Sequence, residues 1–321
     1  MKALICGVGG QDGAYLARLL LDKGYEVWGT SRDAQMASFA NLENLGVRGR
    51  VTARSMAPKD FRSVMSVLRD CAPDEVYFLS SQSSVGLSFE QPAETLESIC
   101  VGALNLMEAI RFLDRSIRFY HASSSECFGD VGRTPADEST PFAPRSPYAV
   151  AKASAHWLVS NYREAYGLFA CNGVLFNHES PLRPVRFVTR KITAAASRIA
   201  RGSRERLQLG RLDIVRDWGW APEYVTAMWS MLQAGEPRDY VIATGEAQPL
   251  ERFVALAFES VGLHWRDHVD SDPGLLRPTD IAWSQGNPAR AARELGWRAQ
   301  FRMKDVVAHM IQAESQHAGA P

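Results

Sequence analysis

The stretch GVGGQDGAYLARLLLDKGYEVWGTSR, residues 7–32, places four glycines between an apolar segment and a helical pattern. The segment KALIC, residues 2–6, comes before them and has the character of a strand. After them come apolar residues at the spacing of one helix face: Tyr15, Leu16, Leu19 and Leu20. The glycines therefore lie at a strand-to-helix turn. Such a turn offers free N–H groups to a pyrophosphate, and glycine lets the backbone approach it. We predict that this turn binds a dinucleotide and is not an ordinary turn.

Short apolar segments alternate with helical patterns over the first half of the chain. The predicted strands are residues 2–6, 26–30, 51–55, 75–80, 117–123 and 169–176. This alternation is typical of an α/β fold with a Rossmann-type, doubly wound parallel sheet. After residue 176 the alternation ends, and helical patterns at 192–202, 223–233 and 250–262 mix with proline-marked turns. We therefore predict a dinucleotide-binding domain over 1–176. A smaller, mixed substrate-binding domain is expected over 177–321, with a strand or helix that can return to the first.

The composition excludes several classes of protein. The 321 residues are 46% hydrophobic and 22% charged, and the formal net charge is zero. This balance predicts neither nucleic acid nor a membrane as partner. The sequence predicts no membrane span and no signal peptide. The five cysteines are scattered without metal-ligand spacing, so we expect reduced thiols, no metal and a cytoplasmic location.

The end of the second predicted strand bears on the choice of cofactor. Folds that bind NAD usually carry an acidic residue there, which holds the ribose hydroxyls. Here the strand ends in Thr30, Ser31 and Arg32, and these side chains suit a 2′-phosphate. This pattern favours NADP over NAD, although Asp33 keeps NAD open as the alternative.

A group of hydroxyl and amine side chains follows the fifth predicted strand. Tyr148 and Lys152 are four residues apart, which puts them on one face of a helix. An ammonium beside a phenol stabilises the phenolate, so we expect Lys152 to lower the pKa of Tyr148 and make it a base. Ser124, in the segment 121–129, could share the same substrate oxygen. A Tyr-x-x-x-Lys pair is also common on surface helices, but the glycine turn and the serine run favour the functional interpretation.

Longer stretches carry a more specific resemblance, which covers nearly the whole chain. They are GQDGAYLARLLLDKGYEV, SSSECFG, PFAPRSPYAVAK, NYREAYGL, LFNHESPLR, FVTRKI, RDWGWAPEYVTAMW and LGW. Through them the chain resembles the extended short-chain dehydrogenase/reductases that modify nucleotide sugars, and most closely the GDP-mannose 4,6-dehydratase family. The segments LFNHESPLR and FVTRKI are the most specific of these.

The resemblance implies a role for each matching residue. The implied catalytic residues are Ser124, Glu126, Tyr148 and Lys152. The implied cofactor-binding residues are Gly7, Gly10, Gln11, Asp12, Gly13, Ser31, Arg32, Ser55, Met56, Leu79, Ser80, Ser81, Tyr148, Lys152, His178 and Arg183. The implied substrate-binding residues are Ser88, Glu126, Asn177, Lys191, Arg216, Arg277 and Asp280. The family further implies NADP as cofactor, a GDP-sugar as substrate and a homodimer or homotetramer.

The implied reaction is an internal hydride transfer with loss of water. Glu126 distinguishes it from simple ketone reduction, which has no use for this carboxylate. A GDP-4-keto-6-deoxymannose reductase or a related epimerase/reductase stays as the alternative, since Tyr148 and Lys152 would serve it equally. A non-catalytic NADP-binding regulator on the same fold is a more remote alternative.

Overall fold

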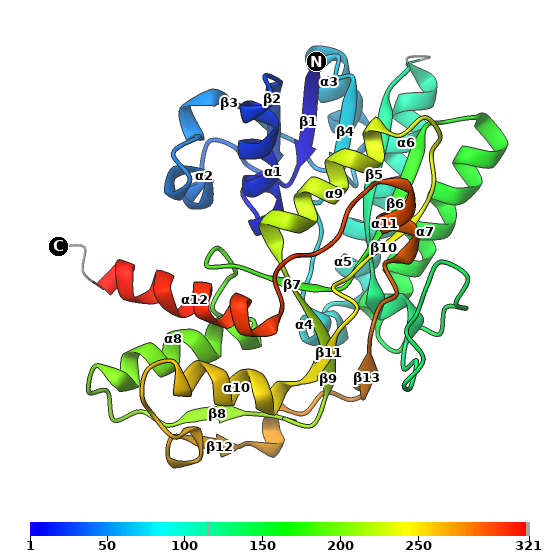
Figure 1. Ribbon diagram of the computed structural model, residues 1–321. Coiled ribbons are helices and arrows are strands. Elements are labelled where there is room, and N and C mark those ends of the chain that lie inside the picture. The colour runs from blue at the N-terminus through cyan, green and yellow to red at the C-terminus, as the bar shows by residue number, and fades with distance from the viewer. Residues whose placement is uncertain (114–115, 319–321) are drawn as a thin grey trace.

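The computed structural model describes residues 1–113 and 116–318 (Figure 1). Within these ranges, seven parallel strands form the main sheet in the order β10–β6–β5–β4–β1–β2–β3. The strands are β1 (Lys2–Cys6), β2 (Glu26–Ser31), β3 (Val51–Ser55), β4 (Glu75–Phe78), β5 (Arg118–Ser124), β6 (Ala170–Leu175) and β10 (Tyr240–Ile242). The six strands expected from the sequence are thereby confirmed, and so is the Rossmann-type sheet. The strand order reverses beside β1, and ligands of such sheets bind at this point.

Helices cover both faces of the sheet. On one face α1 (Gln11–Asp22) packs against α9 (Ala221–Gln233). On the other face lie α3 (Phe61–Cys71), α6 (Gly102–Phe112) and α7 (Pro147–Tyr166). The apolar stripe predicted for α1 is buried, with Leu16 and Leu20 fully covered. Shorter helical segments are α2 (Ala40–Asn44), η1 (Arg48–Arg50), α4 (Val85–Glu90), α5 (Pro92–Leu96), η2 (Glu97–Val101), η3 (Ser125–Phe128) and α11 (Ala289–Glu294).

The second part of the chain forms a smaller mixed layer beside the carboxyl ends of the main strands (Figure 1). Its strands are β7 (Asn177–Glu179), β8 (Leu207–Leu209), β9 (Val215–Trp220), β11 (Ala247–Pro249), β12 (Val269–Ser271) and β13 (Trp283–Ser284). Its helices are α8 (Val188–Ala200), α10 (Leu250–Glu259) and α12 (Met303–Ala318), with the short segments η4 (Trp265–Asp267) and η5 (Pro273–Leu275). A separate apolar core holds this layer together, with Trp218 of β9 packed on Phe253 of α10.

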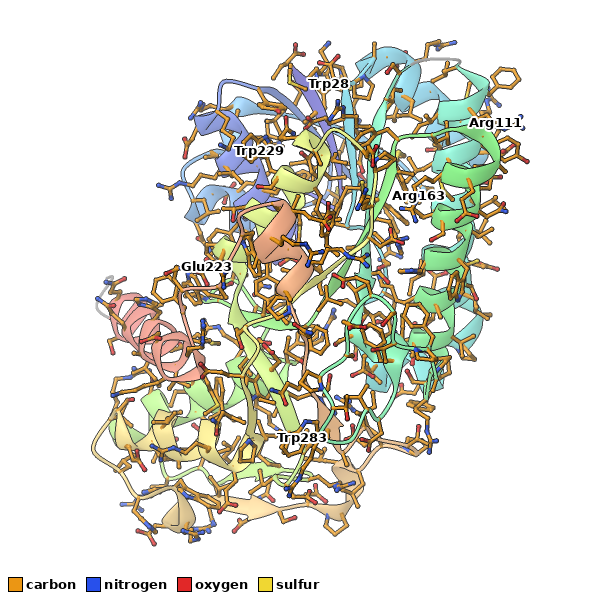
Figure 2. The ribbon with its side chains drawn as sticks, turned by 45° about the vertical axis from the view of Figure 1, so that its right-hand side comes forward. Trp28, Arg111, Arg163, Glu223, Trp229 and Trp283 are labelled. Atoms are coloured by element: carbon orange, nitrogen blue, oxygen red, sulfur yellow. The ribbon has the colours of Figure 1, made fainter. Side chains whose placement is uncertain are left out.

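Two elements of the second half return to the first sheet. β10 pairs with β6 at its edge, and α9 covers α1. Trp229 of α9, labelled in Figure 2, donates its indole N–H to the Tyr25 hydroxyl at 3.1 Å. Glu223, also on α9, accepts the backbone N–H of Gln300 at 2.8 Å, which ties the segment before α12 to this helix. Helix α9 and strand β10 therefore belong to the second half of the sequence but pack as part of the first sheet layer.

The described residues bear on two features that the sequence did not predict, a membrane-spanning helix and a metal site. No helix within residues 1–113 and 116–318 is long and apolar enough to cross a bilayer. The same residues contain no cluster of histidine, cysteine, aspartate and glutamate suited to a metal ion. The five cysteines are free thiols, and all but Cys100 are buried.

Candidate active site

A pocket of about 390 Å³ lies at the carboxyl ends of the main strands, and both parts of the chain line it. Many of the residues singled out in the sequence meet there: Asp12, Leu79, Ser81, Ser124, Glu126, Tyr148, Lys152, Asn177, His178, Arg183, Lys191, Arg216, Arg277 and Asp280. Others lie outside its wall: Gly7, Gly10, Gln11, Gly13, Ser31, Arg32, Ser55, Met56, Ser80 and Ser88. Most of this second group surrounds the glycine turn and the ends of β2, β3 and β4.

The glycine turn between β1 and α1 has the shape that a dinucleotide requires. Gly7 has φ +87°, and a Cβ there would come within 2.9 Å of the Ser80 backbone. A Cβ on Gly13 would collide with the Gly7 carbonyl, so both positions need glycine. Gly10 brings no side chain to cap α1, so the helix N-terminus offers its N–H groups to an anion. Nearby, the buried hydroxyls of Ser31 and Ser80 have no hydrogen-bond partner among the described residues. These features fit the phosphates and hydroxyls of a dinucleotide.

The loop after β2 determines how Arg32 and Asp33 are presented. Arg32 is exposed and has no ion-pair partner in the described part of the chain. The Asp33 carboxylate accepts the backbone N–H groups of Gln35 and Met36 at 3.0 and 3.1 Å. Asp33 is therefore held by its own turn. Ser55, at the end of β3, accepts the N–H of Ala34 at 2.9 Å and fixes the same loop.

Helix α7 carries Tyr148 and Lys152 in its first two turns. It begins after Ser146, whose hydroxyl accepts the Ala149 N–H at 3.1 Å, and Pro147 occupies the first turn. This cap fixes the start of the helix, and so the direction in which the two side chains point. The Lys152 ammonium donates to the Ala122 carbonyl at 2.6 Å and lies 5.8 Å from the centre of the Tyr148 ring.

The expected effect of Lys152 on Tyr148 is wrong for the protein by itself. Burial raises the pKa of the Tyr148 hydroxyl, because desolvation disfavours the phenolate, and a hydrogen bond with Ser124 only partly opposes this. Burial also lowers the pKa of Lys152 to about 8. The ammonium is engaged by Ala122 rather than directed at the phenol oxygen. Removing water therefore has a larger effect than the nearby charge.

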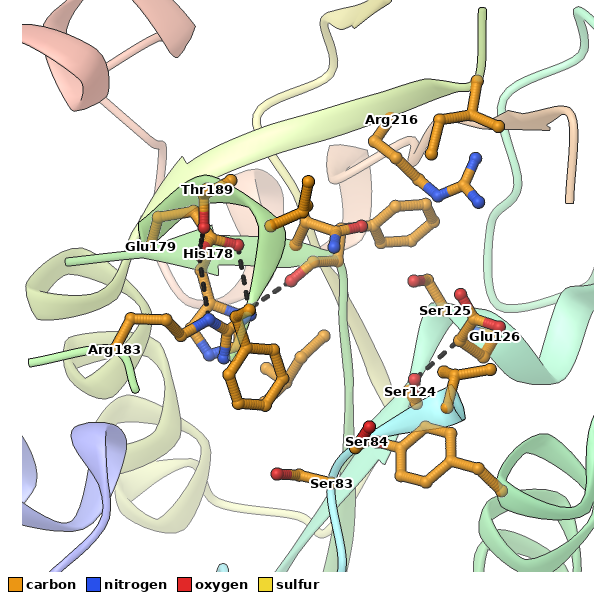
Figure 3. Close-up of a pocket in the computed structure, with 18 of the residues that line it drawn as sticks. Ser83, Ser84, Ser124, Ser125, Glu126, His178, Glu179, Arg183, Thr189 and Arg216 are labelled. Atoms are coloured by element: carbon orange, nitrogen blue, oxygen red, sulfur yellow. Dashed lines mark hydrogen bonds and ion pairs between the residues drawn. The ribbon is translucent and has the colours of Figure 1, made fainter. Parts of the chain in front are cut away.

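Glu126 lies beside Ser124 at the end of β5, with Arg216 across the same space (Figure 3). The Glu126 N–H donates to the Ser124 hydroxyl at 3.2 Å, which holds the two residues together. Burial raises the pKa of the Glu126 carboxyl, while the positive charges of Arg216 and Arg277 oppose the rise. A carboxyl whose pKa is raised holds a proton more readily than an exposed glutamate, which suits a group that exchanges a proton during a reaction.

Asp280 organises the cationic side of the pocket. Arg216 is buried, and its guanidinium lies 3.1 Å from the Asp280 carboxylate. Arg277 lies 3.6 Å from the same carboxylate. This arrangement holds two guanidinium groups against the pocket, where their N–H groups can bind an anionic ligand.

Glu179 is a residue that the sequence reasoning missed. It is almost fully buried and holds Arg183 through two contacts, at 2.9 and 3.1 Å. It also accepts the Thr189 hydroxyl at 2.6 Å, and Figure 3 shows the three side chains on one wall. Glu179 fixes Arg183 toward the pocket. A sequence signal was present, since the two residues are four apart within LFNHESPLR.

Three further positions complete the comparison: Ser88 and Lys191, which the resemblance implied as substrate-binding residues, and Arg211, which it did not. Ser88 is fully buried and donates to the Val85 carbonyl at 2.6 Å, so it does not reach the pocket wall. Arg211 does line the pocket, paired with Asp213 at 2.7 Å. Lys191 lines it as well and donates to the Gln208 carbonyl at 2.7 Å.

Comparisons with known proteins point to one family. The family model described as GDP-mannose 4,6 dehydratase matches residues 4–310. The chain is 44% identical to GDP-mannose 4,6 dehydratase 1 of Arabidopsis thaliana over 326 residues, covering 98% of this chain and 90% of that protein. It is 42% identical to a GDP-mannose 4,6-dehydratase of Vibrio cholerae over 344 residues, covering 97% and 92%. The fold is shared with the dTDP-glucose 4,6-dehydratase DesIV of Streptomyces venezuelae, with a TM-score of 0.88, 22% identity and coverage of 99% and 98%.

Proposed function

This chain belongs to the GDP-mannose 4,6-dehydratase family, a family of lyases, and we propose that it converts GDP-mannose to GDP-4-keto-6-deoxymannose through an internal hydride transfer. Near full-length similarity to relatives with this activity supports the substrate. The observation that carries the mechanism is the meeting of Glu126 and Ser124 with Tyr148 and Lys152 in one pocket. Ketone reduction needs a tyrosine and a lysine, whereas removal of a C5 proton needs a carboxylate as well.

The protein's own residues supply the proton transfers. NADP, held at the glycine turn, would supply a hydride acceptor for C4 of the sugar and later a hydride donor for C6. Tyr148 accepts the O4 proton during oxidation, and Ser124 holds the same oxygen. The 4-ketone makes the C5 proton acidic, so Glu126 removes it and passes it to the C6 hydroxyl, which leaves as water. As C6 is reduced, the proton that Tyr148 took from O4 would be returned to the sugar at C5, so Tyr148 and Glu126 both end in the protonation states in which they began.

Arg183, Arg216 and Arg277 are the residues proposed to bind the diphosphate groups of the two ligands. Each guanidinium is fixed by a carboxylate, Arg183 by Glu179 and the other two by Asp280. Rigid, partly neutralised guanidiniums bind phosphates without a large loss of side-chain entropy. Free cysteines and the absence of a spanning helix in the described ranges support a cytoplasmic location.

The proposed function is tested by incubating the protein with GDP-mannose and no added reductant. We expect a product that has lost one water, detected by mass spectrometry. Untouched GDP-mannose, together with stoichiometric NADPH consumption on a 4-keto sugar, would refute the dehydratase and support the reductase.

We expect tighter binding of NADPH than of NADH. Arg32, directly after β2, has no ion-pair partner among the described residues, while Asp33 is engaged by its own turn, so the loop presents positive charge to a 2′-phosphate. Arg32→Ala should weaken NADPH binding roughly ten- to hundredfold and leave NADH binding nearly unchanged. Calorimetric titration of cofactor-free protein measures both. An equal loss of affinity for NADPH and NADH would show that Arg32 does not contact the 2′-phosphate.

We also propose that the protein forms at least a homodimer through α6 and α7. These helices expose large apolar side chains, among them Phe112 at 76% and Trp157 at 61%. Val150 and Trp157 are seven residues apart on α7, hence on one face of it. Exposed apolar area on two neighbouring helices is typical of a subunit interface.

The dimer is tested by light scattering at micromolar concentration. The wild type should have at least twice the monomer mass, and Trp157→Glu should shift it toward the monomer. Lys304→Glu, an exposed change on α12, serves as the control and should leave the mass unchanged. A monomeric wild type would contradict the proposal.

A further inference from the structure

Asp12 and His178 join the glycine turn to the second half of the pocket. Asp12 is the second residue of α1, and His178 lies on β7, 166 residues later. The Asp12 carboxylate lies 2.9 Å from Nε2 of His178. On the other side of the ring, Nδ1 lies 2.7 Å from the Phe176 carbonyl. The imidazole therefore connects two fixed oxygen acceptors.

This geometry determines the charge of the ring. A carbonyl oxygen accepts only, so Nδ1 must carry a proton to bond Phe176. A neutral ring would then turn the Nε2 lone pair toward the Asp12 carboxylate, which is repulsive. A proton on both nitrogens satisfies both contacts. The structure thus favours imidazolium next to carboxylate.

The groups around the ring agree with this charge. His178 is buried, and its ring stacks on Tyr224 of α9 at 4.5 Å. Burial and the Arg183 guanidinium both oppose protonation, but the Asp12 charge and hydrogen bond exceed them, so the pKa of His178 is raised above 6.5. Glu179, the neighbour of His178 on β7, is engaged by Arg183.

The facing carboxyl is stabilised in its charged form. The pKa of Asp12 is lowered to about 2, because His178 and, more weakly, Arg183 outweigh its burial. Among the other groups near Asp12, Lys152 of α7 is also positive. The tyrosines Tyr15 and Tyr120 stay neutral, since burial raises the pKa of each.

Gln11 adds a second connection between the same segments. Its amide donates to the His178 carbonyl at 3.2 Å, and its oxygen accepts the Ser180 hydroxyl at 2.8 Å. The first two residues of α1 therefore both bind the segment 178–180.

We propose that Asp12 is a positioning residue that keeps His178 as an imidazolium, and that this ion pair holds the glycine turn against the segment 176–183, so that binding of the dinucleotide phosphates depends on the His178 proton. The ligand class rests on the proposed function; the ion pair rests on the geometry.

The sign of the pH dependence follows from the raised pKa. Dinucleotide affinity is full while His178 is protonated and falls as the pH rises through its raised pKa, because a neutral ring loses the ion pair and a positive charge near the phosphates. The pair would break on the acid side only near the Asp12 pKa of about 2. If the His178 pKa is higher by one unit in the complex than in the free protein, affinity falls about tenfold through this range.

The charge state is tested without any ligand, by nitrogen-15 NMR of the histidine rings, with His178→Gln assigning the signal. Near neutral pH, His178 should show the doubly protonated pattern. His121 is an internal control: it is fully buried, and its Nε2 has no partner among the described residues. Burial lowers the pKa of His121 well below its ordinary value, so it should be neutral. A neutral His178 in the wild type would overturn the proposal.

Asp12→Asn removes the negative charge beside His178 but can keep the hydrogen bond, since the asparagine amide can still donate to a neutral Nε2. In this variant the pKa of His178 should fall below 6.5, and the alkaline loss of NADPH affinity, measured by calorimetry, should disappear. An imidazolium that persists in Asp12→Asn, or a wild-type affinity that is flat while His178 titrates, would contradict the proposal. A protein that passes both tests but leaves GDP-mannose unchanged would refute the dehydratase function and leave this inference intact.

Discussion

Tyr148→Phe should lower kcat by about 10²–10⁴-fold and should prevent formation of reduced nicotinamide during turnover. The phenol is the base proposed for the O4 proton, and without it C4 oxidation cannot begin. Its buried hydroxyl has a raised pKa in the protein by itself. A hydroxyl of this kind becomes a base once positive charge is brought beside it, and a bound oxidised nicotinamide would supply that charge. Rapid-mixing absorbance with GDP-mannose measures the step directly.

Tyr166→Phe is the matched control for this substitution. Tyr166 is the last residue of the same helix and is 51% exposed, so its loss should leave kcat near the wild-type value. If Tyr148→Phe still forms reduced nicotinamide at the wild-type rate, another group takes the O4 proton and the assignment fails.

Glu126→Gln should also lower turnover by about 10²–10⁴-fold, but at a later step. The amide keeps the size and hydrogen bonding of the side chain but cannot accept the C5 proton. C4 oxidation should therefore proceed, and the reaction should stall before water is lost. Reduced nicotinamide should accumulate in Glu126→Gln and be absent in Tyr148→Phe. If reduced nicotinamide is absent in both variants, the two residues act on the same step.

The pH profile offers an independent check of Glu126. Its pKa is raised above 4.5 by burial, and the base form is lost as the pH falls through that raised value. The wild-type rate should therefore decline on the acid side at a higher pH than for an exposed glutamate, and Glu126→Gln should lack this limb. Glu164→Gln, an exposed change on α7, should keep the wild-type profile.

Deuterium placed at C4 of GDP-mannose should appear at C6 of the product if the hydride is transferred internally.

Much of the fold and the composition of the site could be predicted from the sequence. Strand segments, the glycine turn and the Tyr148–Lys152 spacing depend on residues a few positions apart, and local sequence encodes them directly. Motif resemblance then led to the family to which the chain belongs. The Glu179–Arg183 pair also lies within a few positions of sequence, but the contact between the two side chains is seen only in the structure.

Tertiary structure decided which distant side chains meet and how much water reaches them. The packing of the smaller sheet on the main one brings Asp12 of α1 to His178 of β7 and Glu126 opposite Arg216 of β9, and no spacing within the sequence specifies either pairing. Burial reversed the expected pKa effect on Tyr148, and local packing turned Ser88 to the Val85 carbonyl. The physical reason is that secondary structure follows from neighbouring residues, whereas charge state and ligand access depend on desolvation and contacts, which exist only after the chain has folded.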